Sequence, residues 1–465
     1  LLQSRILHKY VILVLIFLTS LTIGSIQVLS VQGSSDEKVA AVRLKSTNTQ
    51  GYDAVIAVVF SLGGLGDQGY NDVANTGLVN ARNEYYLTMT TSEPFNVPSI
   101  ASNLLFFGAN SENDLVISLG FASTDGVTAA AQAYPQTNFT IIDSVVDLPN
   151  VASVIFNEQE GSFLAGAMAA LTTSSGKLGF LGGINNPVIN RYGSGFEQGA
   201  RWINPDIEIT WVYSPDPNNP WSNVAGGKIV AENMINSGVD IIFSVAGGTG
   251  FGVFDAVQEA TDAGKKTYAI GADANQDSLK PGAILTSVTK SLDVVVKTQI
   301  DNVVASTWKN GIDIMGLKEG GVNITGMEFT QSEANSVCGN TTRYGFVTAL
   351  ADSISNGNIT VDENIVPQAE WNRFAHNCTG TFYVELPPTP ISSTSSSELS
   401  STSSSSNTPT TTSTETQTIS TSDTPTTPSS QSISPNGQIS GFAYYITSFS
   451  LIILMISRIR IQRKK

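Results

Sequence analysis

The chain has 465 residues, of which 41% are hydrophobic, and its formal net charge at pH 7 is −15. This much apolar material is enough for two ordinary domains, each with its own core. The acidic balance argues against nucleic acid as a partner, because phosphate binding requires a basic face.

Residues 1–30 have the layout of a secretory signal. Arg5, His8 and Lys9 form a basic start, an apolar run follows from Tyr10 to about Ile23, and Ser and Gly residues come after it. This order is typical of a signal peptide. An N-terminal anchor that is not cleaved is the competing interpretation.

The C-terminal part differs in composition from the rest of the chain. Ser and Thr dominate residues 387–438, which predicts an extended stalk, because such a segment cannot bury enough apolar surface to fold. Residues 439–457 are mostly apolar or aromatic and uncharged, and about 17–25 such residues can span a bilayer as a helix. The basic residues of 458–465 predict a cytoplasmic tail. We therefore expect a single-pass C-terminal anchor in the cell membrane, with the globular part extracellular.

Two features agree with an extracellular location. In an oxidising compartment the two cysteines, Cys338 and Cys378, favour a disulfide over free thiols. Five Asn-x-Thr sequons permit N-glycosylation and would make the chain a glycoprotein. They begin at Asn138, Asn323, Asn340, Asn358 and Asn377.

Between Tyr52 and about Val384, strand-like apolar runs alternate with helical patterns. The alternation predicts α/β domains with parallel sheets built from βαβ units. The clearest strands are expected at 114–120, 139–143, 151–156, 177–183, 207–213, 240–246 and 267–270. The clearest helices are expected at 125–134, 161–171, 225–237 and 253–263.

Several predicted strands end in glycine next to polar side chains. The first of them, starting at Val55, stops at Gly63-Gly64, and Asp67, Tyr70 and Asn71 follow. Because the carboxyl ends of parallel strands meet at one edge of an open sheet, we expect such groups to line a cleft between two sheets. Carboxylates, amides and aromatic faces together suit a small hydroxylated ligand. Glycines that only make tight turns are the alternative interpretation.

Six ordered segments between about residues 53 and 315 resemble the basic membrane protein family. Members of this family are solute-binding proteins of ABC transporters, similar to purine nucleoside receptors. The resemblance implies a type I periplasmic-binding-protein fold, with two Rossmann-like lobes, three crossovers and an interlobe cleft. It assigns 52–153 and 285–312 to the first lobe, and 154–284 and 313–385 to the second. The segments are 62–71, 156–166, 178–199, 246–254, 269–276 and 286–290.

The resemblance also implies how a nucleobase would be held. Tyr70, where the family usually has Phe, would stack on one face of the base, and its added hydroxyl would have to be bonded or solvated. Tyr192 or Phe196 would cover the other face. Asp125, which follows Gly120 and Phe121, would hydrogen-bond the edge of the base.

Other matching residues would hold the sugar or shape the cleft. Asp273 and Lys290, side by side, would hold the ribose hydroxyls. Asp67 and Asn71 would form the wall of the first lobe. Gly247-Gly248 would let the backbone approach the ligand closely.

We therefore predict an extracytoplasmic solute-binding protein that captures a nucleoside, with purine nucleosides favoured, and delivers it to an ABC permease. No cofactor is expected. The same fold serves other ligands, so a sugar, an autoinducer or another small solute stays open as the ligand.

Two functions of another class are the alternatives. A nucleoside-cleaving enzyme would need a cluster of Asp residues around a metal, whereas the carboxylates here come singly from separate strands, and the only His between signal and stalk is His376. We therefore expect no enzyme. A signalling receptor would need a partner, because the predicted cytoplasmic tail is short.

Overall fold

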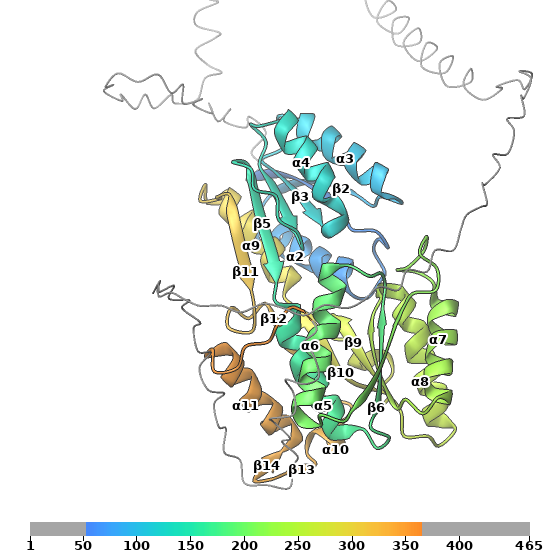
Figure 1. Cartoon of the computed structure of the whole chain (residues 1–465). Coiled ribbons are helices and arrows are strands. Elements are labelled where there is room, and N and C mark those ends of the chain that lie inside the picture. Colours follow the sequence, from blue (N-terminus) through green and yellow to red (C-terminus); the bar gives the residue numbers. More distant parts are fainter. Residues whose placement is uncertain (1–52, 365–465) are drawn as a thin grey trace, which may run out of the picture. The chain divides into compact units, whose positions relative to one another are not determined.

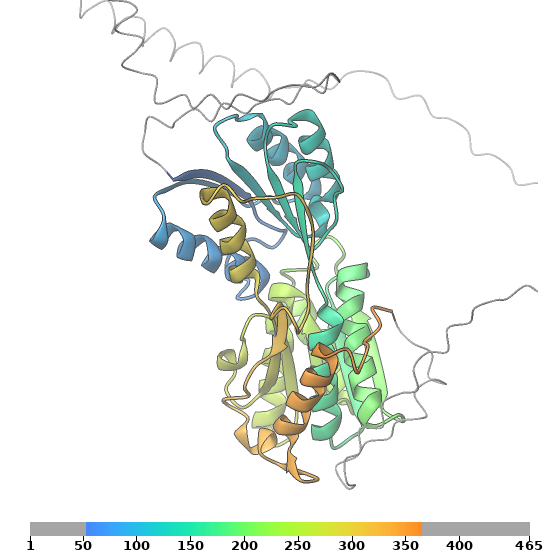
Figure 2. The same cartoon turned by 90° about the vertical axis from the view of Figure 1, so that its left-hand side faces the viewer.

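The computed structural model describes residues 53–364. This part of the chain forms two α/β lobes within one compact unit, and helices cover both faces of the sheet in each lobe (Figure 1). Figure 2 shows the same lobes turned by 90°. The prediction of α/β domains with parallel sheets is confirmed.

The first lobe is built on a six-stranded sheet with strand order β11-β5-β4-β3-β1-β2, in which all neighbours are parallel. Its strands are β1 (Ala54–Val59), β2 (Leu87–Ser92), β3 (Leu115–Leu119), β4 (Phe139–Ile142), β5 (Val151–Phe156) and β11 (Gly311–Met315). Its helices are α2 (Tyr70–Glu84), α3 (Val97–Ala109), α4 (Thr124–Ala133) and α9 (Leu292–Val304), with a 3₁₀ turn, η1, at Phe121–Ser123.

Alternate residues of β1 enter two separate cores. Ile56 and Val58 pack with α2 and α9, whereas Ala57 and Val59 pack with α3 and α4. A strand buried on both faces reads as a continuous apolar run, which is why the sequence identified it. The edge strand β2 and the helix α3 were not predicted, and β2 is polar and largely half-exposed.

The second lobe repeats this architecture. Its strand order is β12-β10-β9-β8-β6-β7, and all neighbours are parallel except β10 and β12, which are antiparallel. Its strands are β6 (Lys177–Gly182), β7 (Glu208–Tyr213), β8 (Ile241–Val245), β9 (Tyr268–Asp273), β10 (Ile284–Lys290) and β12 (Val322–Ile324). Its helices are α5 (Glu158–Thr172), α6 (Pro187–Ile203), α7 (Val224–Asn236), α8 (Gly250–Asp262), α10 (Gln331–Ala334) and α11 (Arg343–Ser355), with 3₁₀ turns η2 (Gly247–Thr249) and η3 (Asp277–Leu279).

The helices α5 and α6 approach each other unusually closely. A Cβ atom placed on Gly199 would lie 1.8 Å from the carbonyl oxygen of Phe163, and one on Gly195 would lie 2.1 Å from that of Gln159. Only glycine allows the two backbones to meet at this distance. The contact fixes the position of α6, which carries Tyr192 and Arg191.

Three connections link the lobes in the described chain, as predicted. They run from β5 to α5, from β10 to α9, and from β11 to β12. The predicted lobe boundaries differ in detail, because β10 hydrogen-bonds within the second sheet, while β5 and β11 lie wholly in the first. A buried apolar strand fits either sheet, so its sequence does not tell which one it joins.

The last described residues belong to the second lobe. Here β13 (Val337–Cys338) and β14 (Thr341–Thr342) form a small antiparallel pair next to α11. Cys338 is disulfide-bonded, and its predicted partner, Cys378, lies outside the described residues. Within residues 53–364 no helix has both the length and the apolar character needed to cross a bilayer. The predicted signal, stalk, membrane helix and tail all fall outside this range.

Candidate ligand-binding site

A cavity lies between the two lobes and encloses about 580 Å³ of empty space, including its opening to solvent. The first lobe contributes Ser61, Leu62, Gly63, Asp67, Tyr70, Asn71, Gly120, Phe121 and Asp143. The second contributes Val188, Ile189, Tyr192, Trp221, Val245, Gly247, Asp273 and Lys290.

The loop between β1 and α2 is held by its own polar side chains. The carboxylate of Asp67 accepts bonds of 2.9 Å from the backbone N–H groups of Gly69 and Asn71. Asn71 Oδ1 accepts a bond of 2.9 Å from the N–H of Ser61, and its amide donates to Asp67. Burial raises the pKa of the Asp67 carboxyl, and these backbone donors oppose the rise. Asp67 and Asn71 therefore shape this wall and present Tyr70 to the cavity.

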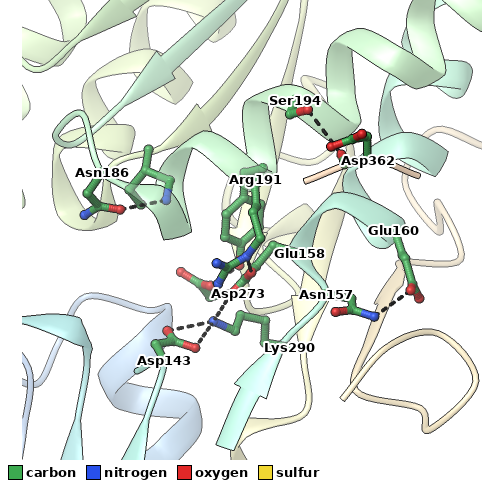
Figure 3. Close-up of polar contacts among 12 residues, drawn as sticks. Asp143, Asn157, Glu158, Glu160, Asn186, Arg191, Ser194, Asp273, Lys290 and Asp362 are labelled. Atoms are coloured by element: carbon green, nitrogen blue, oxygen red, sulfur yellow. Dashed lines mark hydrogen bonds and ion pairs between the residues drawn. The ribbon is translucent and has the colours of Figure 1, made fainter. Parts of the chain in front are cut away.

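Lys290, the last residue of β10, lies in a buried cluster of charged side chains (Figure 3). Its Nζ donates to both carboxylate oxygens of Asp143 at 2.7 Å and to Glu158 Oε1 at 3.0 Å. Arg191 Nε donates to the other oxygen of Glu158 at 2.6 Å. Two cations and two anions thus alternate, which compensates charges that would otherwise be costly to bury.

This cluster joins the lobes. Asp143 follows β4 of the first lobe, Lys290 ends a strand of the second, and Glu158 begins α5 at the first crossover. Burial lowers the pKa of Lys290, but Asp143 and Glu158 raise it, and the net shift is upward. Burial raises the pKa of Asp143, and Lys290 opposes that rise. The lysine is therefore a permanent cation whose three donors are already in use.

Asp273 pairs with a phenol. The Tyr192 hydroxyl donates to Asp273 Oδ1 at 2.6 Å. Burial raises the pKa of Asp273 from 3.8 to about 6, although Lys290 and Tyr192 act in the opposite direction. Asp273 and Lys290 both line the cavity and shift each other's pKa, while the hydrogen bonds of Lys290 go to Asp143 and Glu158.

Aromatic rings reach the cavity from both lobes. Tyr70 and Phe121 come from the first, and Tyr192 and Trp221 from the second. The rings of Phe121 and Trp221 have their centroids 6.4 Å apart. Trp221 fits because the residue beneath it is Gly183, where a Cβ atom would lie 2.2 Å from the indole. Apolar faces therefore border the cavity on both sides.

Eight of the predicted site residues line the cavity, and three do not. Asp125 is exposed on α4 and is not among the residues that line the cavity. Phe196 is fully buried against Phe243 in the core of the second lobe. Gly248 follows the lining residue Gly247 but is itself absent from the lining.

Several residues of the site and its support were not predicted, among them Asp143, Trp221 and Glu158. Asp143 ends a predicted strand, as Asp273 does, and that position was the available signal. Trp221 lies in the segment between β7 and α7, where no local pattern marked it. Glu158 lies in a segment that carried the family resemblance, but its charge pairing depends on residues far away in the sequence.

Comparison with known proteins identifies the family. The model of the family described as "ABC transporter substrate-binding protein PnrA-like" (Bmp) matches residues 54–343. The chain belongs to this family. The Bmp assignment confirms the resemblance and the coarse function, an ABC transporter substrate-binding protein.

Relatives and solved structures agree with it. The ABC transporter nucleoside-binding protein BmpA of Lactococcus lactis is 31% identical over 335 residues, which covers 68% of this chain and 92% of BmpA. An uncharacterized lipoprotein of Pyrococcus furiosus is 32% identical over 286 residues, covering 59% of this chain and 71% of the lipoprotein. A solute-binding protein of an Aeropyrum pernix ABC transporter superposes with a TM-score of 0.61 at 27% identity, covering 70% of this chain and 99% of that one. The type I periplasmic-binding-protein fold is thus confirmed.

The relatives give information on catalysis, and the structure gives information on metal binding. The relatives named above are described as binding proteins or as a lipoprotein, and none of these descriptions names a catalytic activity. Over residues 53–364, no group of three or more His, Cys, Asp or Glu side chains is arranged to hold a metal ion.

Proposed function

We propose that this Bmp-family protein captures a nucleoside, with purine nucleosides preferred, between its lobes and delivers it unchanged to an ABC permease. The observation that carries the proposal is the composition of the cavity. Aromatic rings enter it from both lobes, and a cluster of carboxylates and one lysine lies beside them. A nucleoside has the same two parts, a flat base and a sugar with several hydroxyls.

The aromatic side chains account for the base. Tyr70 on one lobe and Trp221 on the other could cover the two faces of a planar ring. Base stacking on an aromatic side chain contributes ~1–3 kcal/mol and tolerates different bases. Tyr192 is less suited to stacking than the sequence suggested, because it is 1% exposed and its ring packs edge-on against Phe243.

The charged side chains account for the sugar. Asp143 and Asp273 are acceptors for ligand hydroxyls, and each faces the cavity from a different lobe. The one lysine of the lining, Lys290, is neutralised by Asp143 and Glu158. A cavity with several carboxylates and no uncommitted cation in its lining favours an uncharged ligand. The name of the Lactococcus relative, a nucleoside-binding protein, is consistent with this.

Calorimetric titration of the full chain with purine and pyrimidine nucleosides, free bases, ribose and other sugars tests the proposal. The expected result is saturable binding of a nucleoside, which is recovered intact afterwards. Binding of a sugar or another solute instead would keep the fold and remove the nucleoside assignment. Release of free base and ribose would mean that the protein is a nucleoside-cleaving enzyme.

We also propose that capture takes place at the outer face of the cell membrane. The Ser/Thr-rich residues 387–438 would act as a stalk and 439–457 as the anchor, both on composition alone. Detergent dependence of the full chain, compared with a chain that ends before residue 439, tests the anchor. If both chains fractionate with the aqueous phase, the anchor proposal is wrong.

A further inference from the structure

Among residues 53–364, the Tyr70 hydroxyl is the one buried polar side-chain group of the cavity lining without a hydrogen-bond partner. The oxygen is buried, and within residues 53–364 no group forms a hydrogen bond with it. Buried polar groups are nearly always hydrogen-bonded, because an unpaired one costs free energy. Tyr70 is also a lining residue, so this unpaired donor borders the ligand space.

The other tyrosine of the lining provides the contrast. Tyr192 donates its hydroxyl proton to Asp273 at 2.6 Å, so it is fully engaged by the protein. Burial raises the pKa of the Tyr70 phenol well above its usual value, and the charge of Asp143 and a side-chain interaction with that nearby carboxylate add to the rise. Lys290 holds the Asp143 carboxylate, and no hydrogen bond of normal geometry joins that carboxylate to the Tyr70 hydroxyl. Tyr70 thus keeps its proton, and within residues 53–364 its hydroxyl has no hydrogen-bond partner of good geometry.

The surroundings of Tyr70 indicate which part of a ligand would meet this donor. Lys290 Nζ lies over the ring of Tyr70, 5.3 Å from its centroid. The hydroxyl therefore lies in the part of the cavity that contains Lys290 and Asp143. These two charged groups would contact the polar part of a ligand. Phe121 and Trp221 supply the apolar surface elsewhere in the cavity.

We propose that the Tyr70 hydroxyl donates a hydrogen bond to a sugar oxygen of the bound nucleoside and so selects for a specific ligand hydroxyl. Tyr70 is then a specificity-determining residue in addition to a stacking surface. The inference rests on the proposed nucleoside function. It assigns a role to the hydroxyl alone, which a phenylalanine ring would lack.

The substitution Tyr70→Phe removes only this hydroxyl, and its first readout needs no ligand. Because the hydroxyl has no protein partner, the ligand-free variant should unfold at the same temperature as the parent chain or slightly above it. Tyr192→Phe breaks the bond to Asp273 and should lower that temperature. Tyr213→Phe is a matched control outside the cavity lining, since its hydroxyl bonds Asn190 at 2.7 Å. Clear destabilisation by Tyr70→Phe would show that the hydroxyl bonds within the protein, which overturns the inference.

The second readout is calorimetric titration with inosine and its 2′-, 3′- and 5′-deoxy forms. Tyr70→Phe should weaken inosine binding about 5- to 150-fold, whereas Tyr213→Phe should leave it unchanged. The deoxy form that lacks the bonded hydroxyl should bind the parent chain weakly. Tyr70→Phe should not weaken its binding further, because the same hydrogen bond is already missing.

Three outcomes would overturn the inference. Unchanged inosine affinity in Tyr70→Phe would mean that the hydroxyl makes no bond to the ligand. An equal further loss for all four ligands would mean that it does not contact a sugar hydroxyl. Failure of the parent chain to bind inosine or any other nucleoside of the wider panel would reject the proposed function itself, and this inference with it.

Discussion

Asp143 and Asp273 occupy equivalent positions in the two lobes. Asp143 directly follows β4 and Asp273 ends β9, and each of these strands is fourth in its sheet when counted from β2 or β7. Both residues have a positive φ, 68° and 66°, and both line the cavity. A left-handed backbone is uncommon for a residue other than glycine, and such residues concentrate at functional sites. The two lobes thus present one carboxylate each, in the same backbone conformation.

The partners of these two carboxylates differ, and so should their response to pH. Asp143 accepts hydrogen bonds from a lysine, whereas the Asp273 carboxylate accepts one from the Tyr192 hydroxyl. Burial raises the pKa of Asp273 from 3.8 to about 6. Its stabilising contribution is therefore fully present below pH 3.8 and is lost as the pH rises through about 6.

Asp273→Asn should consequently make the ligand-free protein more stable at pH 7, because the asparagine carries no charge that must be desolvated. The advantage should shrink as the pH falls from about 6 towards 4. Thermal unfolding of variant and parent over this range measures it. Asp67 and Asp143 titrate in both proteins, and because their charges act on Asp273, the difference between the curves reports Asp273 together with its coupling to them. Parallel curves would contradict the raised pKa.

Lys290→Met should destabilise the protein by about 3–5 kcal/mol, because Asp143 and Glu158 then share a buried site without their common cation. Adding Asp143→Asn should recover part of the loss, since Glu158 still has Arg191. Urea denaturation of the two single variants and the double variant measures the coupling. Lys228→Met is the control. Its bond to Glu259 is solvent-exposed, so its loss should change the stability little.

Gly199→Ala should destabilise the second lobe by about 3 kcal/mol or more, because the new methyl group would meet the carbonyl oxygen of Phe163 across the α5–α6 contact. Gly326→Ala is a matched change where no atom lies within 4 Å of the added Cβ, and it should be nearly neutral. Thermal unfolding compares the two. Equal effects would mean that α5 and α6 are not held by backbone contact.

Trp221→Ala should weaken nucleoside binding about 5- to 150-fold, by removing the stacking surface of the second lobe. Trp202→Ala provides the comparison. Trp202 packs against Phe163 outside the cavity, so its loss should lower stability without changing the affinity of the folded protein. If both variants bind like the parent chain, Trp221 does not contact the ligand.

The sequence predicted the fold correctly where a local residue pattern has a single structural explanation. Buried strands such as Val151–Phe156 and glycine at strand ends are local signals, and together they predicted the two sheets and the edge at which the cavity lies. The edge strand β2 lacked such a signal, because a strand that is half-exposed has no reason to be apolar.

The details of the site depend on packing that no local pattern reports. Phe196 and Tyr192 lie on the same helix, yet one faces the core of the second lobe and the other reaches the cavity. Lys290 bonds to Asp143, 147 residues away in the sequence, and to Glu158, 132 residues away, so no local pattern indicates these pairings. Asp125 matched the family by its position after Gly120, but it is exposed in the first turn of α4 and is not among the lining residues.

The structure of the full chain in complex with the nucleoside that it binds most tightly would show directly whether a nucleoside binds in the cavity between the lobes. We expect the base between Tyr70 and Trp221, and the sugar hydroxyls within hydrogen-bond distance of Asp143 and Asp273. A nucleoside bound outside this cavity, or a cavity occupied by a different kind of solute, would mean that the cavity is not a nucleoside-binding site.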